Sequence, residues 1–321
     1  MVRIIMSQTG GPEVLTLTDA DPGLPGPGEV LLRQTAIGLN FIDTYHRSGL
    51  YPLALPTGLG LEAAGVVEVA GAGVTLAPGT RVGYCWGPIG AYANHRCIAA
   101  DRLVELPDTV SDEMAAAGLL KGCTTEFLVE RCAGVQPGQW ALVPAAAGGV
   151  GLLLVQWLKA VGAHVIAVAG STAKVELALA HGADHGVTDG EDVAARVRDI
   201  TNGRGVDVVF DGVGKASWEA SLASLKRRGL MISFGNASGP VTGVDLGILA
   251  RMGSLFVTRP TLFDYYATPD AMHTYGARVL AMMASGAIKV RVDQRYALAD
   301  VARAHDDLAA RRTTGSTVLV P

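Results

Sequence analysis

The sequence predicts a two-domain α/β protein that combines a compact β barrel with a doubly wound parallel sheet. Residues 1 to 120 hold short β-rich runs broken by glycine and proline, which is typical of a barrel with irregular connections. Residues 121 to 258 alternate strand with helix, which is typical of a parallel sheet with helices on both faces. Residues 259 to 321 are expected to return to the first domain.

Size and composition fit this architecture. The chain has 321 residues, which is long enough for two cores. Its 49% hydrophobic content, 17% charged content and 41 glycines describe a globular, turn-rich protein. The net charge is −4 and the Lys and Arg residues are dispersed, so we expect no nucleic-acid partner.

The sequence also bears on location. Residues 1–13 contain one arginine and no sustained apolar core, so they do not resemble a signal peptide. No run of about 18 apolar residues is present, so we expect no membrane span. Cys85, Cys97, Cys123 and Cys132 lack the C-x-x-C spacing and are too few for a disulfide scaffold. We therefore expect a reducing cytoplasm.

Short β-rich runs define the first domain. They are Val30–Ile37, Gly65–Val69, Arg81–Tyr84 and Ala91–Ile98. Each run is bounded by turn residues, as expected for barrel strands.

A glycine-rich corner defines the second domain. The apolar run that begins at Ala141 leads into Ala146-Ala-Gly-Gly-Val-Gly151, an amphipathic segment Leu152–Val161 and a second β-rich run His164–Ser171. This order predicts the βαβ unit that binds a dinucleotide. Gly148 allows the backbone to approach a pyrophosphate, and Gly151 allows close packing of helix on strand, although Ala146 replaces the usual first glycine.

The residues after the second strand bear on which dinucleotide is bound. NAD-binding chains carry an acidic residue about 20 positions beyond the glycines. Position 171 is a serine, and Gly170-Ser-Thr-Ala-Lys174 offers two hydroxyls and a lysine, which suit a 2′-phosphate. The alternative is that Lys174 is only a solvated residue near the start of a helix.

The remaining elements continue the alternation. The predicted strands are Val206–Phe210, Gly229–Phe234, Ser254–Thr258 and Thr317–Val320; the predicted helices are Ala173–His181, Ser217–Leu225, Met272–Ser285 and Ala299–Ala310. A ligand should lie along the carboxyl ends of the parallel strands, at Gly170–Ser171, Asp211–Gly214 and Phe234–Gly239. We expect this edge to form one wall of a cleft between the domains.

Several motifs resemble those of one enzyme superfamily. Gly60-Leu-Glu-Ala-Ala-Gly65, followed by Gly71 and Val74, is similar to the G-H-E-x-x-G-x5-G-x2-V signature of the medium-chain dehydrogenases/reductases. With Asn40–Tyr45, Arg228–Asn236 and Thr258–Pro260, the chain resembles the zinc-free quinone oxidoreductase (zeta-crystallin-like) branch. The resemblance implies a GroES-like catalytic domain over 1–120, completed by 259–321, and a Rossmann NADPH-binding domain over 121–258.

The departures from the zinc-dependent branch predict that there is no metal site. Asn40 and Leu61 stand where those relatives place Cys and His ligands, and the four-Cys loop is missing. Zinc needs three or four N, S or carboxylate ligands. Cys123 is more consistent with a small buried hydrophobe, and His181 and His185 are expected in a loop.

The resemblance implies a set of cofactor contacts at the nicotinamide, the pyrophosphate and the adenosine phosphate. They are Asn40, Phe41, Ile42, Asp43, Thr44, Tyr45, Phe127, Gly148, Gly149, Val150, Gly151, Gly170, Ser171, Thr172, Lys174, Val213, Phe234, Gly235, Asn236, Ser238, Arg259 and Pro260. Asp43 has an alternative reading as an N-terminal helix residue. Asp189 lies where this branch often has a tyrosine near the 2′-phosphate, and its charge is expected either to weaken phosphate binding or to face solvent.

The expected activity is NADPH-dependent reduction of a quinone. Asn40, Tyr45 and Tyr51 are the predicted catalytic residues, Asn40 as a hydrogen-bond donor and the tyrosines as an aromatic wall with phenolic donors. Each tyrosine also fits a half-buried place on the barrel surface. Two other functions stay open, namely reduction of the C=C bond of an enone or alkenal, and a non-catalytic NADPH-binding role. By resemblance we expect a homodimer.

Overall fold

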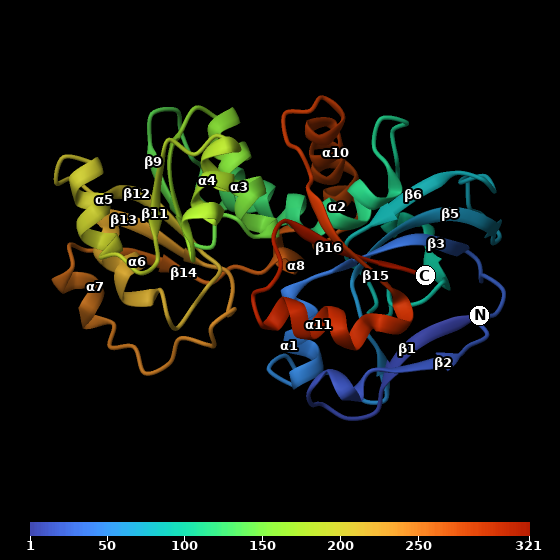
Figure 1. Cartoon of the computed structure of the whole chain (residues 1–321). Helices are drawn as coiled ribbons and strands as arrows, with labels where there is room; N and C mark the ends of the chain where they lie inside the picture. The colour runs from blue at the N-terminus through green and yellow to red at the C-terminus, as the bar shows by residue number, and fades with distance from the viewer. The chain divides into compact units, whose positions relative to one another are not determined.

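The computed structural model describes residues 1–321, and the chain divides into two units (Figure 1). Unit 1 comprises Met1–Cys123, Tyr266–Gly286 and Val290–Pro321, and unit 2 comprises Thr124–Tyr265 and Ala287–Lys289. The predicted roles of residues 1–120 as a catalytic domain and of residues 121–258 as an NADPH-binding domain stay a prediction. None of the helices combines the length and the apolar character that a membrane span requires.

Two β sheets form the framework of unit 1. The smaller sheet has the strand order β2-β1-β4, and the larger has the order β15-β16-β3-β5-β6-β8, with β7 also paired to β3. The strands are β1 (Val2–Met6), β2 (Thr16–Asp19), β3 (Glu29–Leu39), β4 (Thr57–Gly58), β5 (Glu62–Ala70), β6 (Arg81–Tyr84), β7 (His95–Ala99), β8 (Val104–Glu105), β15 (Val292–Ala297) and β16 (Ser316–Val320).

Strand β3 is the central strand of this unit. It pairs with β5 along one edge, and with β7 and then β16 along the other. Eight of its 11 residues are buried, because neighbours cover both of its edges and side chains cover both of its faces. Ile37 and Leu39 therefore lie in the same apolar core as Ile4 and Leu319.

Helices complete unit 1. They are α1 (Phe41–Ser48), α9 (Pro269–Ala271), α10 (Ala277–Ala284) and α11 (Val301–Ala309), with shorter helical turns at Pro12–Val14, Ala100–Arg102, Met272–Gly276 and Leu298–Asp300. Figure 1 shows α11 beside α1, and the two helices are in contact. Helix α2 (Asp112–Glu126) begins in unit 1 and continues past Cys123 as a π-helical segment, Phe127–Cys132.

Unit 2 contains a six-stranded, fully parallel sheet with the order β11-β10-β9-β12-β13-β14. The strands are β9 (Trp140–Val143), β10 (His164–Ala169), β11 (His185–Thr188), β12 (Val206–Asp211), β13 (Leu225–Ser233) and β14 (Phe256–Thr258); the helices are α3 (Gly149–Ala160), α4 (Thr172–Ala180), α5 (Val193–Ile200), α6 (Trp218–Ser224), α7 (Gly247–Arg251) and α8 (Leu262–Tyr265). Helices α3 and α4 lie on one side of the strands and α5 and α6 on the other (Figure 1). The predicted doubly wound α/β class is confirmed.

The glycine-rich corner has the predicted strand, turn, helix and strand in β9, α3 and β10. One detail was wrong: α3 is not amphipathic. Its residues from Gly151 to Leu158 are all buried, including Gln156, and the exposed Lys159 and Ala160 lie at its end. The helix therefore has no exposed polar face along its length.

Three other segments differ from the expectation. Residues 91–94 are not part of a strand, because the Gln34 side-chain amide donates to the carbonyls of Ala91 and Ala93. His185 is not in a loop, since it opens β11 opposite Ile166. The helix expected over 272–285 begins earlier, at Pro269, because Thr268 caps it by accepting from Ala271 N, and its first part is π-helical.

Candidate functional site

The predicted site residues fall on both units. Asn40 to Tyr45 and Tyr51 belong to unit 1, and the others belong to unit 2. Within unit 2, the residues of four loops gather at the carboxyl ends of neighbouring strands β10, β9, β12 and β13.

The first loop joins β9 to α3. Gly148 is the N-cap residue of α3, and no side chain caps this helix start. Gly148, Gly149 and Val150 are partly exposed, so backbone N–H groups and the positive end of the helix dipole face outward, as an anion site requires. A Cβ on Gly151 would lie 2.3 Å from Ala145 O, so this position tolerates only glycine.

The second loop follows β10. Ser171 caps α4, with its hydroxyl accepting from Lys174 N at 3.4 Å. Thr172 opens the helix and Lys174 lies on its first turn. Asp189 follows the neighbouring strand β11, and its carboxylate lies 3.5 Å from where a Cβ on Gly170 would stand. An acidic side chain is therefore next to the residues predicted to bind the 2′-phosphate.

The third and fourth loops follow β12 and β13 and pack on each other. Ser238 N donates to Val213 O at 2.8 Å, and the Ser238 hydroxyl donates to the same carbonyl. A Cβ on Gly235 would lie 2.3 Å from Gly212 O. The side chains of this pair of loops, including Phe234 and Asn236, are half-buried. The two loops thus form one surface.

Asp211 organises the third loop. Its carboxylate accepts from Val213 N (2.8 Å), Gly214 N (2.9 Å), and the hydroxyls of Ser217 and Ser221 (2.6 Å each). The carboxylate is fully buried and satisfied by these four donors. Its role is therefore to hold the loop that carries Val213, and the sequence named only its position at the strand end.

Two other predicted site residues of unit 2, Phe127 and Arg259, make contacts within that unit. Phe127 is buried and its ring stacks on Tyr265, with centroids 4.5 Å apart. Arg259, just beyond β14, donates to Ser233 O at 2.6 Å. Pro260 follows it and is half-buried.

The predicted residues of unit 1 lie on and around α1. Asn40 is the N-cap residue; its N–H donates to Asp43 Oδ2 at 2.9 Å, and Asp43 N donates to Asn40 O at 3.0 Å. The Thr44 hydroxyl donates to Phe41 O. Tyr45 and Tyr51 are half-buried, and their rings meet edge to face, with centroids 5.2 Å apart. The structure thus brings the two tyrosines together as one aromatic surface.

The Asn40 side chain is already engaged. Its Nδ2 donates to Glu62 Oε2 at 2.8 Å, and Asn40 is 5% exposed. Asn40 was predicted to donate to a ligand, whereas one of its two amide hydrogens is already donated to Glu62. Glu62 itself was quoted only as part of a motif.

Asp43 belongs to a buried network and not to an exposed surface. Its Oδ2 also accepts from the Tyr92 hydroxyl at 2.8 Å, and that hydroxyl lies 3.1 Å from His305 Nε2 on α11. Burial raises the pKa of Asp43 to about 7, against the lowering effect of the bonds from Asn40 and Tyr92. Burial and the neighbouring Arg47 lower the pKa of His305 to about 3, so its ring is neutral. The Asp43 carboxylate is fully enclosed, and its place in the first turn of α1 agrees with the alternative reading as an N-terminal helix residue. Its contact with a cofactor stays a prediction.

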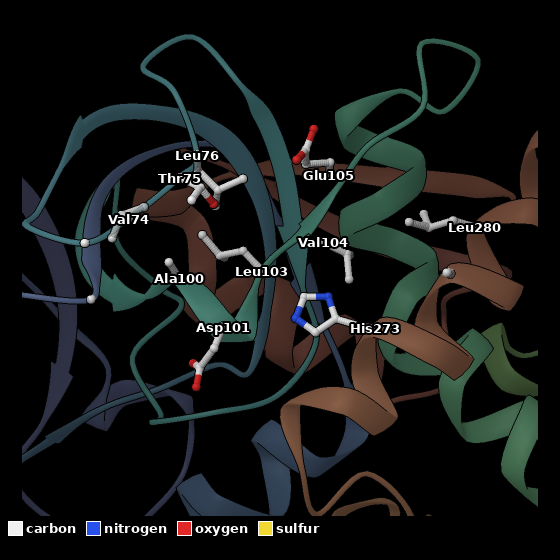
Figure 2. A pocket seen from close by; sticks show the side chains of 13 residues that line it. Val74, Thr75, Leu76, Ala100, Asp101, Leu103, Val104, Glu105, His273 and Leu280 are labelled. Atoms are coloured by element: carbon white, nitrogen blue, oxygen red, sulfur yellow. The ribbon is translucent and has the colours of Figure 1, made fainter.

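A groove elsewhere in unit 1 is distinct from these residues. It has a volume of about 590 Å³ and is lined by Val104, Leu280, Asp101, Glu105 and His273, among others (Figure 2). None of the predicted site residues lines it. Its size alone carries no chemistry, and we assign it no role.

Comparison with known proteins identifies relatives over the whole chain. A family described as alcohol dehydrogenase GroES-like domain matches residues 26–108, and one described as zinc-binding dehydrogenase matches residues 149–282. The quinone oxidoreductase of Pseudomonas aeruginosa is 51% identical and covers 99% of both chains. The crystal structure of Escherichia coli quinone oxidoreductase complexed with NADPH superposes with a TM-score of 0.97 at 46% identity, covering 100% of both chains. The 2-haloacrylate reductase of a Burkholderia species is 40% identical and covers 100% of this chain and 99% of its own.

The residues of this chain do not fit a zinc ion, although one matching family is described by zinc. No group of three or more His, Cys, Asp or Glu side chains is arranged to hold a metal. Leu61 is an apolar residue and 2% exposed, and the Asn40 amide nitrogen donates a hydrogen bond to Glu62. Cys123 is buried with its Sγ 3.6 Å from Cys85 Sγ, as expected for a small hydrophobe.

The raised pKa of Asp43 predicts a pH dependence of stability. The folded protein holds this proton up to about pH 7, whereas the unfolded chain releases it near 3.8, so the free energy of unfolding falls as the pH rises between these values. The Asp43→Asn variant keeps a side-chain oxygen that can accept from Asn40 N and from the Tyr92 hydroxyl, but it has no carboxyl group to titrate. Between pH 5 and pH 8 the wild type should lose about 3 kcal/mol more of its free energy of unfolding than the variant, measured by urea unfolding.

The exposed Asp101→Asn variant provides the control and should follow the wild-type pH dependence. Equal pH dependence in Asp43→Asn and the wild type would show that Asp43 titrates normally.

Proposed function

The chain belongs to the zinc-free quinone oxidoreductases of the medium-chain dehydrogenase/reductase superfamily, and from this we propose that it reduces a quinone with NADPH. The observation that carries the proposal is the gathering of four loops at one edge of the parallel sheet, around a helix start that no side chain caps. The full-length similarity to proteins named quinone oxidoreductase supports it.

We propose that residues 121–258 form the NADPH-binding domain. When bound, the cofactor supplies the reducing equivalents through its nicotinamide. The N–H groups of Gly149, Val150 and Gly151 would bind the pyrophosphate at the start of α3. Ser171, Thr172 and Lys174 offer two hydroxyls and a cation to the 2′-phosphate, with Gly170 beside them. Val213 and the residues from Phe234 to Ser238 would line the path toward the nicotinamide.

Residues 1–120, completed by 259–321, are proposed as the catalytic domain. A quinone is already electrophilic, so a Lewis acid is not required to polarise it. Tyr45 and Tyr51 provide an aromatic surface on which a flat acceptor can be oriented, and their edge-to-face contact holds both rings in place. In this proposal catalysis depends mainly on orientation.

A second candidate activity is reduction of an activated C=C bond. It is favoured by one observation, the 40% identity to a 2-haloacrylate reductase over the full chain. The same residues would serve both reactions, because each acceptor takes a hydride at an electrophilic centre.

We propose that the protein works as a homodimer in a reducing compartment such as the cytoplasm. The dimer is supported by the edge strand β14, which pairs only with β13 and carries Phe256 at 57% exposure. A reducing compartment is supported by the four free cysteines. Cys85 and Cys123 lie next to each other, with their sulfur atoms 3.6 Å apart, and form no disulfide. Sedimentation in solution measures the oligomeric state directly.

Activity with different acceptors tests the proposed function. The purified protein should oxidise NADPH slowly without an acceptor and rapidly with a panel of quinones, measured by absorbance. An enone and 2-chloroacrylate serve as the comparison acceptors. Higher kcat/KM with these than with every quinone would favour the C=C reductase, and no acceleration by any acceptor would reject both activities.

Lys174 should confer preference for NADPH over NADH. A charge-assisted hydrogen bond contributes roughly 1.5–3 kcal/mol, so Lys174→Ala should weaken NADPH binding about 10- to 150-fold and NADH binding little. Asp189→Asn should strengthen NADPH binding, because it removes a negative charge beside the phosphate. Fluorescence titration of both cofactors measures these changes.

Lys159→Ala is the matched control for Lys174, because Lys159 pairs with Asp184 and lies in the last turn of α3. If Lys174→Ala weakened the binding of NADPH and of NADH equally, Lys174 would not bind the 2′-phosphate.

Tyr45 and Tyr51 should act through their rings more than their hydroxyls. Each Tyr→Phe variant should retain most activity, because at most a net hydrogen bond of about 0.5–1.5 kcal/mol is lost. Each Tyr→Ala variant should lose more, since the surface that orients the acceptor is removed. The measurement is quinone-dependent NADPH oxidation in the four variants. A loss of about 1000-fold in kcat for either Phe variant would identify a general acid and contradict this mechanism.

A further inference from the structure

Glu62 is a fully buried carboxylate directly beside a predicted catalytic residue. It opens β5, and its side chain is 0% exposed. Oε2 accepts from Asn40 Nδ2 at 2.8 Å, and Oε1 accepts from Leu120 N at 2.6 Å. Lys121 Nζ lies 3.7 Å from Oε2.

The backbone around Glu62 is built to accommodate this carboxylate. Gly38 of β3 faces Glu62 across the sheet, and a Cβ on Gly38 would lie 2.4 Å from Glu62 Oε2 and 2.1 Å from Ala116 O. Only glycine leaves room there, because L side chains do not tolerate contacts under 3.0 Å with backbone. The side chain is therefore confined between β3 and α2.

Stability alone does not explain this arrangement. Lys121 is also buried, at 6% exposure, and removing two charges from water costs more than a separated pair commonly returns. Apolar side chains of similar size would usually serve a core equally well. The pair therefore needs a reason other than its contribution to folding.

The reason lies in what a carboxylate does to an amide. An ionised carboxylate only accepts hydrogen bonds, so the end of the Asn40 amide that faces Glu62 has to be its nitrogen. The amide oxygen is then the atom that accepts from Asp43 N in the capping box of α1, and an amide oxygen has a second lone pair with which to accept another bond. Burial raises the pKa of Glu62, and the charge of Lys121 and the bonds from Asn40 and Leu120 oppose that rise. A protonated Glu62 could donate, and the amide would then be able to turn.

We propose that Glu62, supported by Lys121, is a positioning residue that fixes which end of the Asn40 amide donates and which accepts at the reaction site. The inference rests on the proposed function and on the prediction that Asn40 is a catalytic residue, which would place its amide against the nicotinamide carboxamide or the acceptor. It assigns to Asn40 an oxygen that accepts from the carboxamide N–H₂ or from a reduced acceptor O–H. That role differs from the simple donor expected from the sequence.

The first variant is Glu62→Gln, which keeps the size of the side chain. A glutamine has one oxygen, so it can accept from Leu120 N or from Asn40 Nδ2 and presents its own N–H₂ to the other. When it accepts from Leu120 N, the Asn40 amide turns. The second variant is the double replacement Glu62→Gln with Lys121→Met, which removes both charges of the buried pair and guards against simple misfolding.

Asp112→Asn is the matched control. Asp112 accepts from Arg81 Nε at 2.9 Å and from the Thr35 hydroxyl at 2.6 Å, so it is a structural carboxylate of the same unit. It makes no contact with Asn40 among its hydrogen bonds. Its replacement should lower the melting temperature and leave kcat within about twofold of wild type, because it moves no group near the site.

Two measurements test whether Glu62 positions the Asn40 amide. In steady-state kinetics with NADPH and 1,4-benzoquinone, both Glu62 variants should lose about 10- to 100-fold in kcat/KM, since small misplacements of an orienting group cost that much. The double variant should regain melting temperature without regaining activity. NMR of the asparagine side-chain amides provides a readout independent of activity. The chain has four asparagines, and only the Asn40 N–H₂ pair should shift strongly in both Glu62 variants.

The outcomes separate this inference from the proposed function. A wild-type protein whose NADPH oxidation is not accelerated by any acceptor would reject the function, while the Asn40 amide shift and the NADPH titration would still test the positioning. An active wild type together with wild-type kinetics in the double variant would overturn the inference. An Asn40 amide signal that is the same in wild type and both variants would also overturn it.

Discussion

Backbone packed directly on backbone at glycine is the constraint on which the candidate site depends. Gly151 brings α3 against the turn at Ala145, and Gly235 brings the loop after β13 against Gly212. At each place a Cβ would lie within 2.3 Å of a carbonyl oxygen. At these two places the loops are held by main-chain contacts, and the Asp211 carboxylate adds side-chain hydrogen bonds to the loop after β12. A side chain at either glycine would separate the two backbones.

Most of the fold of unit 2 is predictable because its signals are local. The apolar runs of β9 and β10 are short and continuous, as expected for strands covered on both faces. Strand β12 is also buried throughout, although it contains Asp207 and ends at Asp211. The glycine corner between β9 and α3 marks its own position in the sequence. The prediction that α3 is amphipathic was wrong, because the pattern of residue types along a helix does not show how many of its faces the rest of the fold covers.

The parts that sequence reasoning missed depend on partners distant in the chain. Tyr92 and His305 are 213 positions apart and share a hydrogen bond. Glu62 and Leu120 are 58 positions apart. No spacing rule links such residues. The hydrogen-bond networks of Asn40 and Asp43 could therefore not be predicted, although Asn40 itself was predicted as a catalytic residue. A charged residue inside an apolar motif was the available signal, and Glu62 within Gly60–Gly65 carried it.

The pairing of β3 also dictates an order of assembly during synthesis. Leu39 and Ile37 of β3 pair with Thr317 and Leu319 of β16, so the two strands are separated by the whole of residues 124–265. A ribosome delivers all six strands of the parallel sheet before it delivers β16. Until then, β7 covers only residues 29–33 on that edge of β3, and residues 37–39 have no strand partner there. A strand made early in synthesis is thus among the last to be completed, and its exposed end is a site at which the nascent chain could pair with other chains.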